Sequence, residues 1–169
     1  MKYLDIKCPD VANGIGIRVS LFCSGCDYHC KGCFNPESWD FNAGKDFTQE
    51  EIEIILNHLG KSYINGITLL GGEPLHHKNR KEILNLIRII KEKYPTKNIW
   101  CYTGNTFENF IEENDPIIIE IFNNLDVLVD GPFIEDLKNL SIKFRGSSNQ
   151  RILNMKESMK ELKPIKLES

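Results

Sequence analysis

Three cysteines in one short loop constrain this chain more strongly than any other feature of its sequence. Cys26, Cys30 and Cys33 are spaced C-x3-C-x2-C within the stretch CSGCDYHCKGC. Such a loop can direct three thiolates at one object, and thiolates select zinc, copper(I) or iron–sulfur clusters. Structural zinc usually takes two separated ligand pairs, whereas Cys8 and Cys101 are singles. Because an iron–sulfur cluster normally takes four cysteines, three would leave one iron open to bind a substrate.

Cys23, the first residue of that stretch, has two interpretations. As a fourth cluster ligand it would turn the site into an electron carrier. The residues before it alternate between apolar and other side chains, which predicts a strand over Ile17–Cys23. On a strand, Cys23 would pack as a small apolar residue, as free cysteine often does. We favour this second interpretation.

Composition limits the class of protein. A chain of 169 residues predicts one domain. Its net charge of −3 gives no basic face for nucleic acid, so we expect no direct nucleic-acid partner. We expect no membrane association, because no apolar run approaches the roughly 20 residues of a membrane span, and no signal peptide, because no basic start is followed by an apolar run. Six cysteines, mostly clustered, indicate reduced thiols in the cytoplasm rather than a disulfide scaffold.

Strands and helices are predicted in alternation. After the strand Ile17–Cys23 we expect strands at Gly66–Leu70, Asn98–Tyr102 and Leu125–Val129. Helices should begin after the caps Thr48, Asn79 and Asp115, and a short helix should span Thr106–Glu113. This alternation indicates an α/β fold with a mainly parallel sheet. Two weaker expectations are an edge strand at Tyr3–Ile6 and an extended segment at Lys138–Phe144; residues 152–169 only close the domain.

Polar or glycine-rich residues follow several predicted strands, and open α/β sheets bind ligands at the carboxyl ends of their strands. In Gly71–Pro74 the glycines allow close backbone approach to a ligand, and the Glu73 carboxylate suits an ammonium group. Asp130 would either bind ribose hydroxyls or cap a turn. Arg145 or Arg151 would bind a carboxylate, unless their loop is merely solvated.

The four histidines, at positions 29, 58, 76 and 77, are expected to be solvated rather than bound to a metal. Adjacent loop residues such as His76 and His77 rarely converge on one ion.

Longer stretches resemble one family. GIGIRVSLFCSGCDYHCKGCFNPESWDF, from Gly14 to Phe41, resembles the activating proteins of anaerobic ribonucleotide reductase, a group of radical S-adenosylmethionine enzymes. Four later stretches match the same family in the same order: GGEP, WCYTG, DVLVDGPF and RGSSNQR. The wider superfamily usually has an aromatic or aliphatic residue before the third cysteine, where this chain has Gly32. That departure agrees with the narrower family.

The resemblance implies a fold and a set of ligands. The fold would be a truncated, open (β/α) partial barrel, because the chain is shorter than the ~250 residues of a complete barrel. One radical S-adenosylmethionine domain would span residues 1–169. The cluster would be a [4Fe–4S] cluster on the three loop cysteines. The backbone of Gly32, Cys33 and Phe34 would lie against the cofactor's adenine. Gly72 and Glu73 would hold its methionyl amino group, Thr103 would line its pocket, and Arg145 or Arg151 would take its carboxylate.

The resemblance also implies a reaction. The reduced cluster would cleave S-adenosylmethionine to methionine and a 5′-deoxyadenosyl radical, which would take a hydrogen atom from a glycine of the reductase's catalytic subunit. An electron donor such as a flavodoxin or ferredoxin would be a second partner. Two alternatives remain: a radical S-adenosylmethionine enzyme that acts on a small molecule, and a non-enzymatic iron–sulfur carrier.

Overall fold

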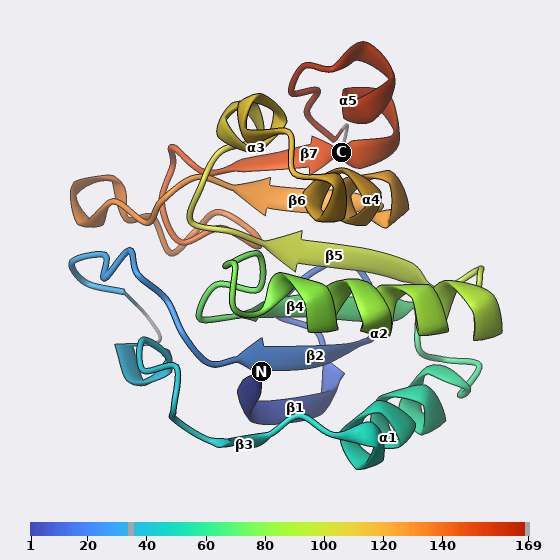
Figure 1. The fold of residues 1–169 in the computed structure, drawn as a ribbon. Helices are drawn as coiled ribbons and strands as arrows, with labels where there is room; N and C mark the ends of the chain where they lie inside the picture. Colours follow the sequence, from blue (N-terminus) through green and yellow to red (C-terminus); the bar gives the residue numbers. More distant parts are fainter. Residues whose placement is uncertain (34–35, 168–169) are drawn as a thin grey trace.

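The strands predicted from the alternating pattern lie side by side in one open sheet (Figure 1). The computed structural model describes residues 1–33 and 36–167. Its seven-stranded sheet has the order β3-β1-β2-β4-β5-β6-β7. The strands are β1 Lys2–Asp10, β2 Arg18–Cys23, β3 Lys45–Asp46, β4 Gly66–Gly71, β5 Asn98–Tyr102, β6 Val127–Asp130 and β7 Arg151–Asn154. The central strands β2, β4, β5 and β6 pair in parallel, and β1, β3 and β7 join in antiparallel pairs.

The larger helices cover one face of this sheet, in front of the strands in Figure 1. The helices are α1 Gln49–Leu59, α2 Arg80–Lys93, α3 Phe107–Glu113, α4 Pro116–Asn124 and α5 Met155–Glu161, with short 3-10 helices η1 Pro36–Ser38 and η2 Glu135–Leu137. Two predicted caps are confirmed. The Asp115 side chain accepts from the Ile117 N–H at 2.9 Å, and in the predicted capping box the Glu51 side chain accepts from the Thr48 N–H at 2.7 Å.

Alternate residues of each central strand face opposite sides of the sheet, as the pleat requires. On β2, Val19, Leu21 and Cys23 belong to the main apolar core beneath the helices. The residues between them face the other side, where Phe22 lines a cleft. The sheet therefore has one face packed by helices and one face that helps to form a cleft.

The predictions from sequence gave too few and too short strands in the outer parts of the sheet. The predicted edge strand Tyr3–Ile6 is a nine-residue strand, β1, and it lies between β2 and β3 rather than at the edge. The strand β7 and the helix α5 were not predicted. The expectation of an α/β domain is confirmed, with its parallel pairing confined to the four central strands. The finer expectation of a partial barrel stays a prediction.

The expected extended segment Lys138–Phe144 is wrong. It forms bends and turns with one isolated bridge, between Lys138 and Ser147. Phe144 has a positive φ of 64°, and its ring packs edge-on against Trp100 with a centroid distance of 5.4 Å. This aromatic contact holds the segment folded against the sheet, so it does not continue as a strand.

None of the helices within residues 1–33 and 36–167 is long and apolar enough to cross a membrane.

Candidate active site

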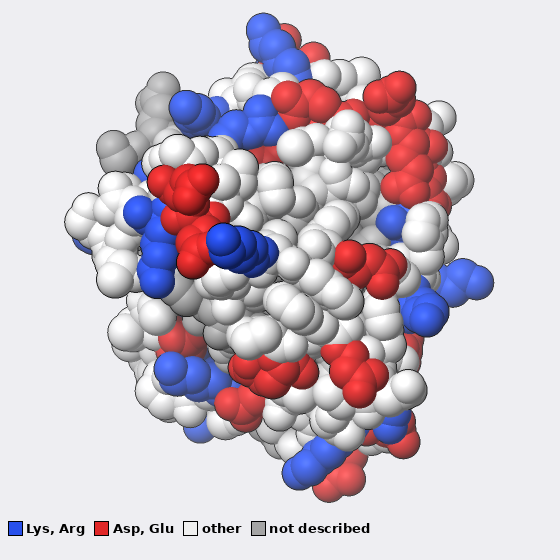
Figure 2. All heavy atoms as spheres, turned by 90° about the vertical axis from the view of Figure 1, so that its left-hand side faces the viewer, with Lys and Arg blue, Asp and Glu red and all other residues white. Residues whose placement is uncertain are grey.

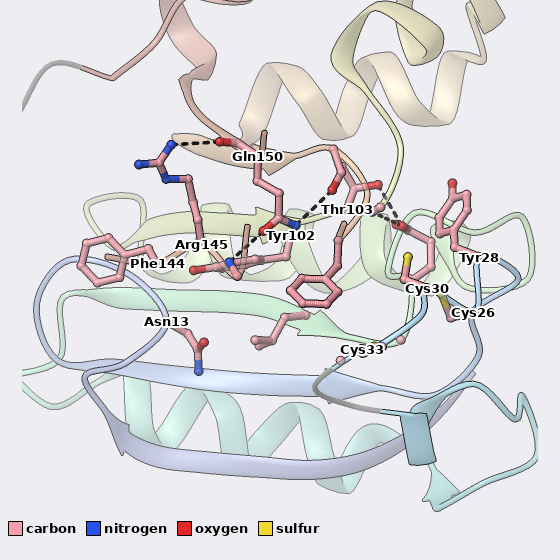
Figure 3. A pocket seen from close by; sticks show the side chains of 18 of the residues that line it. Asn13, Cys26, Tyr28, Cys30, Cys33, Tyr102, Thr103, Phe144, Arg145 and Gln150 are labelled. Carbon is pink, nitrogen blue, oxygen red and sulfur yellow. Dashed lines mark hydrogen bonds between the residues drawn. The ribbon is translucent and has the colours of Figure 1, made fainter. Parts of the chain in front are cut away.

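A cleft of about 590 Å³ brings most of the predicted site residues together. It runs along the face of the sheet opposite the helices, and Figure 3 shows the cysteines at one end of it and Asn13, Phe144 and Arg145 at the other. Its polar and glycine lining includes Cys26, Cys30, Cys33, Gly71, Gly72, Glu73, Thr103, Gly104, Gly131, Arg145 and Gln150. The cysteine loop, the Gly71–Glu73 turn and the end of β5 thus share one cavity.

The cysteine loop has no regular secondary structure and depends on residues with positive φ. Gly25 and Gly32 have φ of 101° and 76°, a region that suits glycine. The loop is held at its start, where the Gly25 and Cys26 N–H groups donate to the carbonyls of Ser38 and Trp39 at 2.6 and 3.1 Å. These contacts position the first cysteine, while the following residues turn back toward the cleft.

The donor set of this loop fits an iron–sulfur cluster. All three thiols reach the same cleft from eight consecutive residues. Burial raises the pKa of Cys26 to about 11, although backbone N–H groups of Tyr28 and His29 hydrogen-bond to its sulfur and act in the opposite direction. A thiol with this pKa becomes a thiolate when metal binding displaces its proton. Backbone N–H groups directed at a ligating sulfur are the outer-shell contacts that such ligands use.

Cys23 does not reach the cleft. It is completely buried in the core on the helix-covered face, and burial raises its pKa to about 12. Cys101 lies in the same core, and Cys8 packs against it. The structure therefore agrees with the interpretation of Cys23 as a packing residue.

The Gly71–Glu73 turn lies directly against the start of the cysteine loop. The Gly72 N–H donates to the Cys23 carbonyl at 2.8 Å, and the Glu73 N–H donates to the Gly25 carbonyl at 2.7 Å. A Cβ on Gly72 would come within 2.5 Å of the Gly25 oxygen. Glycine is required at position 72 because the two backbones pass so closely.

The Glu73 side chain links two walls of the cleft through hydrogen bonds. Its Oε1 accepts from the Thr103 hydroxyl at 2.9 Å and from the Gly104 N–H at 2.7 Å, and its Oε2 accepts from the Leu75 N–H at 3.0 Å. Burial raises the pKa of this carboxyl to about 7, and the same three hydrogen bonds act to lower it. The carboxylate thus joins the turn after β4 to the turn after β5.

Asn79 also connects the start of the cysteine loop to the turn that carries Glu73. It was predicted to cap α2, but its side chain makes no capping hydrogen bond. Its amide instead donates to the carbonyls of Ser24 and Glu73, at 3.1 and 3.0 Å. Sequence reasoning missed this role because an asparagine before a helix is most simply interpreted as a cap.

Asp130 and Arg151 are not brought to the cleft. Arg151 binds both Asp130 oxygens, at 2.9 and 2.5 Å, and also pairs with Glu108. Asp130 further accepts from the Phe107 N–H at 2.8 Å, at the start of α3. Asp130 therefore supports the start of α3, whose N-cap is Thr106, rather than the turn that follows its own strand. We therefore withdraw both residues from the set expected to contact the cofactor.

Arg145 does line the cleft. Its Nη1 donates to the Gln150 carbonyl at 3.0 Å, and its Nε is buried without a hydrogen-bond partner among the described residues. A buried donor of this kind normally has a partner. Of the two arginines considered for a carboxylate, only Arg145 has an unused donor beside the cleft.

The remaining predicted residues lie near the cysteines. Gly32 is exposed, and a Cβ there would meet the Glu135 side chain at 3.0 Å. Phe34 lies outside the described residues. Tyr28, which was not predicted, lines the cleft and packs so closely on Gly104 that a Cβ there would lie 2.6 Å from its ring. Its position in the sequence between two predicted cluster ligands could have indicated that it lies at the site.

His76 differs from the expected solvated histidine. Its ring nitrogen Nε2 lies 2.5 Å from the Asp27 carboxylate, and the ring packs on Phe41 at 4.5 Å. His77 is exposed, as predicted. His76 therefore adds another contact between the cysteine loop and the segment after Glu73.

Comparison with known proteins agrees with the geometry. Residues 12–153 match a family model described as a 4Fe-4S single cluster domain. An anaerobic ribonucleoside-triphosphate reductase-activating protein of Enterobacteria phage T4 is 40% identical over 152 residues, covering 90% of this chain and 93% of the relative. The chain belongs to this family of reductase-activating proteins. Family members from Escherichia coli K12 and Vibrio cholerae are each 39% identical, over 92% and 90% of this chain and over 100% and 97% of their own lengths. The family resemblance identified from the motifs is thereby confirmed.

Proposed function

We propose that this protein activates the catalytic subunit of anaerobic ribonucleotide reductase by generating a glycyl radical on it. Family membership supports this role, since the relatives are named for activating that reductase. The observation that carries the mechanism is the shared cleft, where three cysteine thiols lie beside the Gly71–Glu73 turn. A metal-binding loop and a ligand-binding strand end open into the same space.

Cys26, Cys30 and Cys33 would hold a [4Fe–4S] cluster. The matched domain family is defined by a single cluster of this type. With Cys23 buried beneath the helices, three thiols remain for the cleft, and one iron of a bound cluster would have no protein sulfur. This arrangement argues against the electron carrier, which normally needs a fourth cysteine.

S-adenosylmethionine would bind between the cysteine loop and the ends of β4 and β5. When bound, the cluster and this cofactor would supply the one-electron chemistry for removing a hydrogen atom from the partner's glycine. The backbone at Gly71 and Gly72 would approach the methionyl amino group, because no side chain intervenes. Glu73 would act as a positioning residue, since its oxygens already accept from Thr103, Gly104 and Leu75.

Arg145 does not suit the cofactor's carboxylate, although its buried Nε lacks a partner in the part of the chain that the structure describes. The amino and carboxylate groups of the cofactor share one carbon, and Figure 3 places Arg145 at the other end of the cleft from the cysteines. Thr103 would line the pocket through its backbone and methyl group while its hydroxyl holds Glu73.

A protein substrate suits the open cleft better than a small molecule does. The sheet is open and the cleft lies on the face opposite the helices, so a segment of a large partner can reach the cysteines. Glycine suits the reaction because no side chain blocks its α-hydrogen. We place this encounter in the cytoplasm, with a flavodoxin or ferredoxin as the electron donor.

The test is radical formation on the reductase. The protein is mixed anaerobically with S-adenosylmethionine, a reductant and the matching reductase subunit, and electron paramagnetic resonance follows the product. Wild-type protein should produce an oxygen-sensitive doublet on the reductase. Labelling the reductase with α-deuterated glycine should collapse the doublet and transfer deuterium into 5′-deoxyadenosine.

Two outcomes would contradict the proposal. Normal cofactor cleavage without a protein radical or deuterium transfer would favour the enzyme that acts on a small molecule. A cluster that forms but never cleaves S-adenosylmethionine would favour the carrier.

A further inference from the structure

The His76 imidazole is held in one orientation by its own part of the chain. The His76 N–H donates to the Glu73 carbonyl at 3.2 Å, and the His76 carbonyl accepts from the Asn79 and Arg80 N–H groups at 2.8 and 2.9 Å. The ring nitrogen Nδ1 accepts from the Lys78 N–H at 3.1 Å. Because Nδ1 is an acceptor, the neutral imidazole carries its proton on Nε2. His76 therefore presents one N–H donor in a fixed direction.

This donor is directed at the cysteine loop. The His76 Nε2 lies 2.5 Å from the Asp27 carboxylate, and Asp27 directly follows Cys26 in the sequence. The Asp27 side chain is 68% exposed, whereas the His76 side chain is only 17% exposed. Contacts between two mobile surface side chains contribute little. Here one partner is already immobilised, so less conformational entropy is lost when the hydrogen bond forms.

Phe41 holds the residue on the other side of Cys26. The Phe41 ring lies so close to Gly25 that a Cβ on Gly25 would come within 1.9 Å of it. The same ring packs against the His76 ring with a centroid distance of 4.5 Å. Gly25 and Asp27, the two neighbours of Cys26, are thus held by two aromatic rings that contact each other.

These contacts matter because residues 24–33 form no helix or strand. No ladder of backbone hydrogen bonds fixes the direction of the side chains in this loop. Holding Gly25 and Asp27 restricts the backbone dihedral angles at Cys26, and these angles determine which rotamers its thiol can adopt. Outer contacts of this kind orient the ligands of a metal site and raise its affinity for the metal.

We propose that His76 is a positioning residue for the cluster, which acts through Asp27 to hold Cys26 in the orientation that ligates iron. This inference rests on the proposed function, because it requires a cluster bound at the cysteine loop. His76 lies three residues after Glu73. The hydrogen bond to Asp27 therefore also fixes Cys26 relative to the turn that would bind S-adenosylmethionine.

We attribute the role of His76 to the position of its donor rather than to charge. The neutral imidazole adds no charge beside the cysteines. On the face at the carboxyl ends of the strands, Figure 2 shows Lys and Arg scattered among Asp and Glu, with uncharged surface between them. Asp27 therefore does not belong to a large patch of one sign, and its own charge can be separated from its hydrogen bond by experiment.

The first test measures iron retention after anaerobic reconstitution. His76→Phe keeps an aromatic ring beside Phe41 but removes the Nε2 donor, whereas His76→Gln keeps an N–H donor at a similar distance from the backbone. His77→Phe alters the exposed neighbouring histidine and is the matched control. Iron release to a chelator should be about tenfold faster than wild type in His76→Phe, and within about threefold of wild type in the other two variants.

The second test asks whether His76 acts through Asp27. Asp27→Ala should release iron about as fast as His76→Phe. The double variant should release it no faster than either single variant, because both changes remove the same hydrogen bond. The cluster-free forms of all variants should unfold at the urea concentration of the cluster-free wild type, since a partly exposed hydrogen bond contributes little to global stability.

Several results would overturn the inference. Wild-type iron release in His76→Phe would show that the donor is not needed, and equally fast release in His76→Gln would show that its chemistry does not matter. Additive effects in the double variant would show that the two residues act separately. A lower urea midpoint in cluster-free His76→Phe would assign the iron loss to general destabilisation.

These measurements use neither the reductase nor S-adenosylmethionine. The inference can therefore fail while the wild-type protein still forms the glycyl radical on the reductase. Wild-type protein that binds no cluster would instead refute the proposed function, and this inference with it.

Discussion

Leu69 and Leu70 are neighbours on β4, yet they belong to two different environments. Leu69 is completely buried in the core beneath the helices. Leu70 lines the cleft on the opposite face. The same contrast holds for Cys23 and Phe22 on β2. The side chains on the helix-covered face are apolar, and other well-packed apolar side chains could replace them. The cleft face instead carries the groups that define the chemistry.

The largest expected effect separates the cysteines of the two faces. Cys30→Ala should abolish the cluster and all radical formation, because two thiols cannot hold it. Cys101→Ala, on the helix-covered face, should keep the iron content of wild type. Iron per protein after anaerobic reconstitution measures both variants. Equal iron loss in Cys30→Ala and Cys23→Ala would revive the four-cysteine carrier.

The two leucines of β4 should separate stability from binding. Leu69→Ala should lower the free energy of unfolding by about 2–5 kcal/mol, as large-to-small changes in a core do. Leu70→Ala should cost less stability but weaken S-adenosylmethionine binding. Urea unfolding and anaerobic cofactor titration measure the two effects. Equal stability losses with unchanged cofactor affinity would contradict the division between the faces.

The raised pKa of Glu73 predicts a pH dependence of stability. Between pH of about 4.5 and about 7 the folded protein retains a proton at this carboxyl that the unfolded chain has lost. Stability should therefore fall as pH rises through this window, by up to about 3 kcal/mol, with the loss complete above it. Urea unfolding at several pH values tests this expectation. The slope should flatten in Glu73→Gln, and an identical slope in that variant would assign it to another group.

Removing the Glu73 side chain should affect the cofactor more than the cluster. Glu73→Ala disconnects the turns after β4 and β5, so S-adenosylmethionine affinity should fall at least about tenfold. Iron content should remain near that of wild type. Thr103→Val is the matched variant, since it removes one of the same hydrogen bonds and should have a smaller effect in the same direction. Unchanged affinity in Glu73→Ala would exclude a positioning role.

The smallest expected effect distinguishes the two arginines. Arg145→Gln should leave cofactor affinity near that of wild type, because Arg145 lies at the end of the cleft away from the cysteines. Arg151→Gln should also leave affinity unchanged but should lower stability, because Arg151 pairs with Asp130 and Glu108. Cofactor titration and urea unfolding of both variants measure the difference. A clear loss of affinity in either variant would return that arginine to the cofactor.

Local patterns predicted the parallel centre of the fold well. The strand at Asn98–Tyr102, the short helix that ends at Glu113 and the helix cap at Asp115 were all found where the pattern placed them. Each depends on residues within one turn or one alternating run. The antiparallel strand β7 was missed because it forms by pairing with β6. No local sequence pattern indicates that pairing.

The candidate site divides in the same way. The cysteine spacing and the Gly71–Glu73 turn are local, and both lie at the cleft. Asp130 and Arg151 are separated by 21 positions and hydrogen-bond to each other. Sequence alone could not predict this pairing. The contact of Asn79 with Ser24 spans 55 positions and could be found only in the folded chain.

The Asn79 amide has a consequence for how the site assembles. It joins the start of the cysteine loop to the Glu73 carbonyl, and both contacts are made by protein groups alone. The cofactor end of the cleft is therefore preorganised before iron arrives. On the proposed function, incorporating the cluster would restrict mainly the rotamers of the three cysteines, so the conformational entropy lost at that step would come from a few side chains rather than from the scaffold. A fold arranged in this way would not have to refold when it takes up its cluster.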